Sequence, residues 1–257
     1  MPDLLPLLVS ESLKRAGFAH GFSTRLGGVS EPPYDSLDFA ILRDPGPLAE
    51  NQHRLADAVG YDPSRLYQTK QVHGRAVMLG EGDPAALLVQ EADALVAEAG
   101  SGAAVAVRVA DCVPILVADP ASGRVAAVHA GWRGVVADVV GAAVRQLGAR
   151  QGGLIAAIGP CIGPCCFEVG EEVGELIVRT TTAGVIARRD EARQKVFVDL
   201  RSGVRTQLRA LGLSDSAIDD VPGRGSPGCT RCDEHRFYSY RRDGDSSGRL
   251  IAVIVAR

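Results

Sequence analysis

The centre of the chain shows the clearest pattern of hydrophobic and polar positions. Residues 103–109 and 113–119 are rich in β-branched and small apolar side chains, and the apolar run resumes over 125–129 after the turn Pro120-Ala121-Ser122-Gly123. Short apolar runs on either side of a turn with Pro and Gly predict paired strands. We therefore expect three strands here, the last two forming an antiparallel hairpin.

A helical pattern follows the hairpin. Between residues 134 and 148, apolar side chains recur at helical spacing, which predicts one amphipathic helix packed on the sheet. The other elements expected are strands over 154–158 and 250–256 and helices over 171–180 and 200–211.

These elements favour the α+β class. Hairpins occur where a doubly wound fold would alternate strictly between strands and helices. No linker, composition shift or internal repeat divides the sequence. We expect a single domain over 1–257, with a mixed central β-sheet or sheets packed by helices.

The composition is that of a globular protein. Of the 257 residues, 46% are hydrophobic and 23% charged, and the net charge of −3 offers no basic surplus for nucleic acid. No apolar run reaches the ~18 residues of a membrane helix. The N-terminal stretch 1–15 has an acidic residue and two prolines where a secretory signal would be basic and then apolar. We expect a cytoplasmic protein without membrane or nucleic-acid partners, whose six cysteines stay reduced.

The hairpin permits a geometric prediction about two reactive side chains. If its turn pairs Asp119 with Arg124, His129 lies opposite Pro114, and Cys112 lies beyond that pair on the neighbouring strand. Cys112 and His129 then share a face as diagonal neighbours, with Cα atoms about 7–8 Å apart. A register slip of one residue would place them on opposite faces.

A second histidine, His73 in Gln71-Val72-His73-Gly74, lies in a separate loop. A thiolate and two imidazoles suit zinc, with a fourth position left for water. A single histidine beside a glycine is more often an ordinary surface or core residue. The coincidence of His73, Cys112 and His129 beside glycines favours a site, because glycines at 74, 131 and 134 let backbone or substrate come close.

The remaining cysteines give a weaker signal. Cys229 and Cys232 have metal-clip spacing, but a four-thiolate site would have to recruit Cys161, Cys165 or Cys166. We favour ordinary buried thiols. The Gly- and Pro-rich segment 159–168 is either a pocket wall or a tight structural turn, and Trp132 is expected in the core.

Three arginines are candidates for binding an anion. Arg25 precedes Leu-Gly-Gly, and Arg241 and Arg242 precede Asp-Gly, so guanidinium groups lie beside flexible turns. Paired hydrogen bonds from such groups suit phosphate. The alternative is ordinary solvated charge on a surface turn.

Several of these segments together resemble a known family. STRLGGVS at 23–30, QVHG, ADCVPI, HAGWRG, IGPCIGPCCFEVG and SYRRDG at 239–244 follow the order found in laccase-domain proteins, the YfiH-type polyphenol oxidases, also known as purine nucleoside phosphorylases. The resemblance covers nearly the whole chain and implies a single α+β domain with a metal held by His73, Cys112 and His129. Two departures, Val109 and Asp38-Phe39, lie near the expected pocket and bear on substrate preference.

The resemblance implies a zinc-dependent purine nucleoside phosphorylase. The expected substrates are adenosine, inosine or S-methyl-5′-thioadenosine with phosphate, with adenosine deamination as a side activity and Arg25, Arg241 or Arg242 holding phosphate. The same family is also linked to the correction of peptidoglycan precursors, and no residue of this sequence supports or opposes that role.

The same residues are also compatible with two other functions. A copper polyphenol oxidase would use the same His₂Cys set, with Met78 the only internal candidate for an axial ligand, but five histidines are too few for several coppers. A metal-free cysteine hydrolase would use Cys112 as nucleophile and His129 as base.

Overall fold

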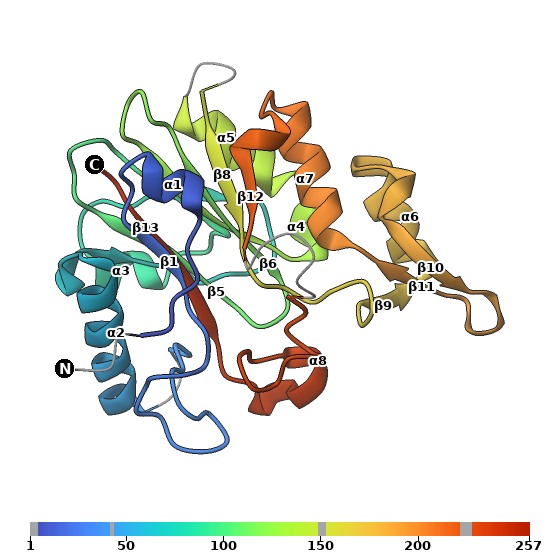
Figure 1. The fold of residues 1–257 in the computed structure, drawn as a ribbon, viewed down its shortest axis with the longest axis horizontal. Coiled ribbons are helices and arrows are strands. Elements are labelled where there is room, and N and C mark those ends of the chain that lie inside the picture. Colours follow the sequence, from blue (N-terminus) through green and yellow to red (C-terminus); the bar gives the residue numbers. More distant parts are fainter. Residues whose placement is uncertain (1–4, 42–43, 149–152, 222–227) are drawn as a thin grey trace.

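The computed structural model describes residues 5–41, 44–148, 153–221 and 228–257. Its largest sheet has the strand order β12-β8-β6-β7-β4-β3 and mixes parallel and antiparallel pairs. The first three of these strands are labelled near the centre of Figure 1. Its strands, in the order of the sheet, are β12 (Ile218–Asp220), β8 (Ile155–Ile158), β6 (Val113–Ala118), β7 (Val125–Ala130), β4 (Ala94–Ala97) and β3 (Val77–Leu79). The expected class, α+β with mixed sheets packed by helices, is confirmed.

The central hairpin has the predicted register. His129 in β7 pairs with Pro114 in β6, and the N–H of Asp119 donates to the carbonyl of Arg124 at 2.9 Å to close the turn. Cys112 lies just beyond the end of β6 and on the same face as Pro114, since alternate residues of a strand share a face. The hairpin therefore brings Cys112 and His129 to one face, as the sequence predicted.

A second sheet packs against this face of the first. It has the order β1-β13-β5-β2, with β1 (His20–Phe22), β13 (Leu250–Val255), β5 (Ala104–Val109) and β2 (Leu66–Tyr67). Between the two sheets lies a core cluster that includes Leu95, Val107, Leu116, Ala127 and Ile254. Burial of these side chains from water is the main force that holds the sheets together.

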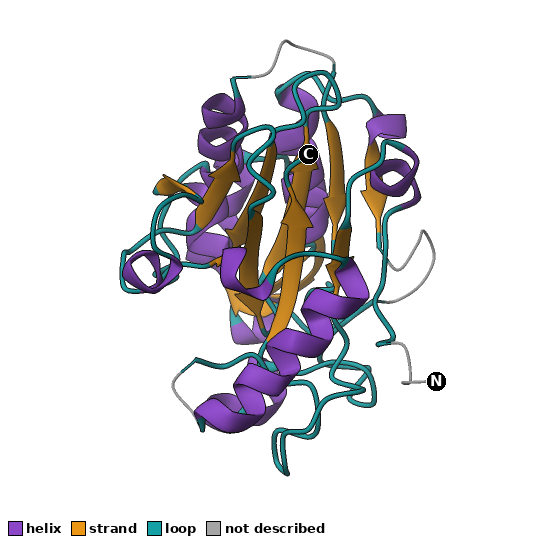
Figure 2. Cartoon of the chain, turned by 90° about the vertical axis from the view of Figure 1, so that its left-hand side faces the viewer, coloured by secondary structure: helices purple, strands orange, loops and turns teal. Residues whose placement is uncertain are grey.

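Helices cover the outer faces of both sheets (Figure 2). The 15-residue α2 (Pro45–Val59) places Leu55 in a cluster on the outer face of the four-stranded sheet. On the other side, α5 (Val139–Leu147) and α7 (Leu200–Ala210) pack against the six-stranded sheet in the largest core cluster. Three short helices lie elsewhere in the described chain, namely α1 (Glu11–Arg15), α3 (Pro84–Leu88) and α8 (Tyr240–Asp243).

One expected helix is divided in two. The helix predicted over 134–148 is α4 (Trp132–Val136) followed by α5. Asp138 interrupts it with a positive φ of 63°, and its carboxylate accepts the N–H of Gly141 at 3.2 Å. Asp is favoured at the N-cap of a helix because its carboxylate accepts a backbone N–H of the first turn that has no acceptor within the helix. The apolar side chains keep their helical spacing across the break, so the sequence pattern predicted one continuous helix.

A small three-stranded sheet projects from the body beside α6 (Glu171–Thr180), at the right of Figure 1. Its order is β10-β11-β9, with β10 (Ile186–Asp190), β11 (Lys195–Val198) and β9 (Glu168–Gly170). The sequence had not indicated these strands. Across the described ranges, no helix combines the length and the apolar character of a membrane span. The N-terminal stretch 1–15 is described only from residue 5 onward.

Candidate metal centre

Three predicted donors converge at one end of the six-stranded sheet. The ligand atoms of His73, Cys112 and His129 all lie within 4.8 Å of one another. Sγ of Cys112 is 3.7 Å from Nε2 of His73, and the two imidazole rings are 4.8 Å apart between centroids. His129 is buried, Cys112 is half-buried and His73 is exposed, so the group is open on the His73 side. This donor set can bind a metal ion.

Asp93, which the sequence analysis did not identify, organises both histidines. It lies immediately before β4, in the position that the β4–β7 register places opposite His129. Its Oδ1 contacts Nδ1 of His129 at 2.8 Å and also accepts the backbone N–H of His73 at 2.8 Å. Its Oδ2 accepts the N–H of Gly74 at 2.6 Å. With Nδ1 held in this way, Nε2 of His129 is the nitrogen left to act as a ligand, as in carboxylate–histidine–metal sites.

Glycine is required at one position beside the donors. A Cβ built on Gly131 would lie 2.7 Å from Cδ2 of His73 and 3.0 Å from Sγ of Cys112. A Cβ built on Gly134 would lie 3.2 Å from the carbonyl oxygen of Gly74. The absence of side chains here lets the 71–74 loop approach the hairpin, as predicted.

The thiol and the buried imidazole stabilise each other's charged forms. Burial would raise the pKa of Cys112, but the charge of His129 and hydrogen bonds from both histidines outweigh it and lower that pKa to about 6. Burial would lower the pKa of His129, but the Cys112 thiolate and Asp93 raise it to about 9. The pKa of Asp93 is also lowered despite its burial, chiefly because it accepts hydrogen bonds from His129 and Gly74. Both shifts favour the charged forms, a thiolate at Cys112 and an imidazolium at His129.

Asp111, the residue before Cys112, fixes the backbone on that side. It has a positive φ of 90°. Its Oδ1 accepts the hydroxyl of Thr230 at 2.6 Å, and its Oδ2 accepts Ser239 Oγ at 3.0 Å and the N–H of Arg241 at 2.6 Å. A carboxylate that accepts three hydrogen bonds ties the C-terminal segment to the turn that carries Cys112 into β6.

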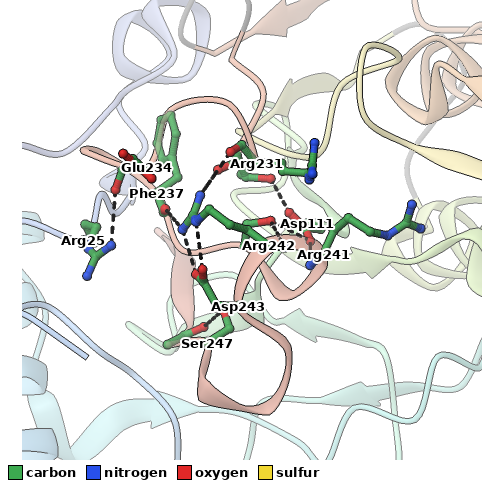
Figure 3. Close-up of polar contacts among 12 residues, drawn as sticks. Arg25, Asp111, Arg231, Glu234, Phe237, Arg241, Arg242, Asp243 and Ser247 are labelled. Atoms are coloured by element: carbon green, nitrogen blue, oxygen red, sulfur yellow. Dashed lines mark hydrogen bonds and ion pairs between the residues drawn. The ribbon is translucent and has the colours of Figure 1, made fainter. Parts of the chain in front are cut away.

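The three predicted anion-binding arginines have different surroundings (Figure 3). Arg242 donates to the carbonyls of Thr230, Arg231 and Phe237 and pairs with Asp243 at 2.8 Å. These contacts are structural, because they cross-link the loop around α8.

Arg25 is also engaged with protein groups. It pairs with Asp35 at 3.2 Å, donates to the carbonyl of Glu234 and lies 4.7 Å from the centre of the Tyr238 ring. Arg241 is exposed, and its Nη1 donates to the carbonyl of Glu168 at 2.9 Å. Phosphate binding by any of the three stays a prediction.

The cysteine-rich segments also differ from the expectation. Cys165, Cys166, Cys229 and Cys232 form a second group whose sulfur atoms lie within 4.8 Å of one another and which can bind a metal. Cys165 and Cys232 are exposed, so the interpretation of ordinary buried thiols is wrong for them. The sequence pattern missed this group because its cysteines come from two segments more than 60 positions apart, which only the tertiary fold brings together.

The Gly- and Pro-rich segment 159–168 and Trp132 are both packed against other parts of the protein. A Cβ on Gly159 would come within 2.3 Å of the Phe22 ring and 2.9 Å of Pro114, which indicates a tightly packed turn. Trp132 is half-buried and packs against the largest core cluster.

The fold and the donor set define a class: an α+β protein with a solvent-open His₂Cys centre at the end of a mixed sheet. Residues 19–257 match the model of the multi-copper polyphenol oxidoreductase laccase family, and the chain belongs to this family. The resemblance seen in the sequence motifs is thereby confirmed.

Several relatives are similar over almost their full length. A purine nucleoside phosphorylase of Streptomyces coelicolor is 40% identical, over 93% of this chain and 95% of the relative. One of Deinococcus radiodurans is 39% identical, over 97% and 92%. Among solved structures, YlmD from Geobacillus stearothermophilus superposes with a TM-score of 0.85 at 30% identity, covering 96% of this chain and 94% of that one.

Proposed function

We propose that this protein is a metal-dependent purine nucleoside phosphorylase whose centre is formed by His73, Cys112 and His129. The observation that carries the proposal is the convergence of these donors within 4.8 Å, with one side open to solvent. Relatives that are 39–40% identical over more than nine-tenths of the chain bear the name purine nucleoside phosphorylase, which supports the choice of reaction.

Zinc is the metal that the donors favour. A thiolate and two imidazoles bind zinc with distances of about 2.3 Å to sulfur and 2.0–2.1 Å to nitrogen, and three protein ligands leave one position for water or substrate. A bound zinc would supply Lewis acidity at that position. The only internal methionine, Met78, packs against the core between the sheets, and this argues for zinc over the copper alternative.

The reaction sets the requirements for the rest of the site. In phosphorolysis, a phosphate oxygen forms a bond to C1′ of the ribose while the bond from C1′ to the purine nitrogen breaks, and that electron pair leaves with the base. The site must hold the phosphate dianion and favour the departing base. Asp93 and Asp111 keep the donor residues in place, while exposed Arg241, tied to Asp111 through its backbone, is the arginine we propose for phosphate.

Adenosine, inosine and S-methyl-5′-thioadenosine are the proposed nucleosides, with deamination of adenosine as a secondary reaction. The deaminase activity would place water on C6 of the purine and release ammonia. The water would occupy the open position beside His73, and its proton must pass to the departing amino group.

A cysteine hydrolase is the second candidate, and one specific observation favours it. Cys112, His129 and Asp93 have the nucleophile, base and orienting-carboxylate order of a catalytic triad, with His129 Nδ1 2.8 Å from Asp93. The lowered pKa of Cys112, about 6, would supply a thiolate. His73 has no part in that mechanism, whereas a metal site accounts for all four residues.

The products identify the reaction. Purified protein is incubated with adenosine, with and without inorganic phosphate, and the products are separated by chromatography. We expect adenine and ribose 1-phosphate only when phosphate is present, and loss of this activity on chelation with recovery on adding zinc. Release of adenine that is indifferent to phosphate contradicts a phosphorylase, whereas inosine formed without phosphate reports the secondary deamination. Release of adenine without phosphate that survives complete removal of metal favours the hydrolase.

A further inference from the structure

We infer that Cys165, Cys166, Cys229 and Cys232 form a second metal site, a structural zinc centre separate from the His₂Cys centre. The four sulfur atoms lie within 4.8 Å of one another. Sγ of Cys232 is 3.3 Å from Sγ of Cys166 and 3.6 Å from Sγ of Cys165. The inference does not depend on the proposed enzymatic activity.

The sulfur spacing fits a single ion. Four sulfurs at about 2.3 Å from a tetrahedral zinc are about 3.8 Å from one another, and Cys₄ is a common structural zinc site. The separations of 3.3 and 3.6 Å lie a few tenths of an ångström below this value, and no pair of the four sulfurs is more than 4.8 Å apart. Clusters with several irons are larger than one ion and hold their four cysteine sulfurs farther apart, so the spacing disfavours an iron–sulfur centre.

Hydrophobic packing accounts for Cys229 and in part for Cys166, but not for Cys165 and Cys232. Cys165 and Cys232 are exposed and Cys166 is half-buried, although unpaired thiols are usually among the most buried side chains. Exposed thiols from two distant segments nevertheless point at one another. Arg231 adds a nearby cation, with Nη1 3.5 Å from Sγ of Cys166. Four thiolates around a divalent ion carry a net charge of −2, which this guanidinium partly offsets.

The centre would join two segments that support the first site. Cys165 and Cys166 belong to the 159–168 turn, and Cys229 and Cys232 belong to the segment before α8. Thr230, between the two latter cysteines, donates to Asp111 at 2.6 Å, and Asp111 precedes Cys112. A structural zinc would therefore hold the segment that orients Asp111, as a metal cross-link of long-range segments stabilises a fold.

Metal stoichiometry tests the inference without any activity measurement. Protein is produced with added zinc under reducing conditions, and bound zinc is counted by mass spectrometry of the digested protein. We expect the double variant Cys165→Ser/Cys232→Ser to hold one zinc fewer than the wild type. Cys161→Ser is the matched control: Cys161 is buried outside the group, its sulfur accepts from Arg201, and a serine hydroxyl can do the same. This variant should keep the wild-type count.

Cobalt gives a second readout that does not require the double variant to fold. Co²⁺ is titrated into metal-free Cys112→Ala protein, in which the His₂Cys centre lacks its sulfur. We expect the intense sulfur-to-cobalt charge-transfer band and visible bands of a tetrahedral tetrathiolate, reaching saturation at one equivalent. Their absence overturns the inference, as does an intact-protein mass two hydrogens low under these reducing conditions, which would indicate a disulfide. Loss of phosphorolysis alone would bear only on the proposed function.

Discussion

The carboxylate of Asp93 contacts Nδ1 of His129 at 2.8 Å, and through the same oxygen it holds the backbone N–H of His73. One buried acid thus fixes two ligands that come from different parts of the chain. Its position follows from the pairing of β4 with β7, in which Asp93 lies opposite His129.

Replacing Asp93 by asparagine should weaken metal binding. The amide removes the charge that orients His129, and such changes to residues behind a ligand cost about 10–100-fold in affinity. Competition with a chelator measures the change. The exposed Asp57 in α2 provides the control Asp57→Asn, which should bind metal like the wild type. An Asp93→Asn protein with unaltered affinity would show that this carboxylate does not position the ligand.

Gly131→Ala should disrupt the metal centre, because the added methyl group would crowd two of its ligands. The added Cβ would lie 2.7 Å from the His73 ring and 3.0 Å from the Cys112 sulfur, so one of these ligands must move. We expect at least a tenfold loss of metal affinity, by the same chelator competition, with the fold retained by circular dichroism. At Gly184 a Cβ meets nothing closer than 3.9 Å, so Gly184→Ala is the matched control. Equal affinities for the two variants would contradict the model of a crowded centre.

The two neighbouring arginines should respond differently to truncation. Arg241→Ala should raise the KM for phosphate about tenfold with little change in stability, because the exposed side chain is the proposed phosphate ligand. Arg242→Ala should lower the free energy of unfolding by about 1–3 kcal/mol, because it leaves several half-buried acceptors without their donor. Phosphate kinetics and urea denaturation separate the two effects. If Arg242→Ala changes only phosphate kinetics, their assignments are reversed.

His20 should make stability fall in mild acid. Burial lowers its pKa, against opposing contributions from the Phe18 carbonyl, Asp219 and Glu11. Nε2 of His20 accepts the N–H of Ser10 at 2.8 Å, so protonation there would place two donors face to face. Since the folded-state pKa lies below the ordinary value of 6.5, the unfolded chain binds the proton more readily. The contribution to stability is complete above pH 6.5 and is lost as the pH falls below it.

The free energy of unfolding of wild type and His20→Gln, measured between pH 7.5 and about 5 by urea denaturation, tests this linkage. We expect a flatter pH dependence for His20→Gln. The exposed His53 supplies the control His53→Gln, which should follow the wild-type curve. Parallel curves for all three proteins would mean that another group causes the acid sensitivity.

Part of the fold and site could be read from local sequence. The Pro120–Gly123 turn fixed the register of β6 and β7, and the period of two along a strand then placed Cys112 and His129 on one face. The long apolar runs predicted the central strands, while the helix break at Asp138 was hidden because the apolar spacing continues across it. His73 was a candidate because it adjoins a glycine, and the family motifs independently implied it.

Neighbouring residues and motif order were enough to predict the central hairpin, the α+β class and the chemistry of the three candidate donors. The support that Asp93 gives to both histidines and the meeting of four cysteines from two distant segments are visible only in the folded chain. Such contacts depend on which strands and loops become neighbours across the sheet. That choice is made by burial of the whole core between and outside the sheets, and no local spacing encodes it.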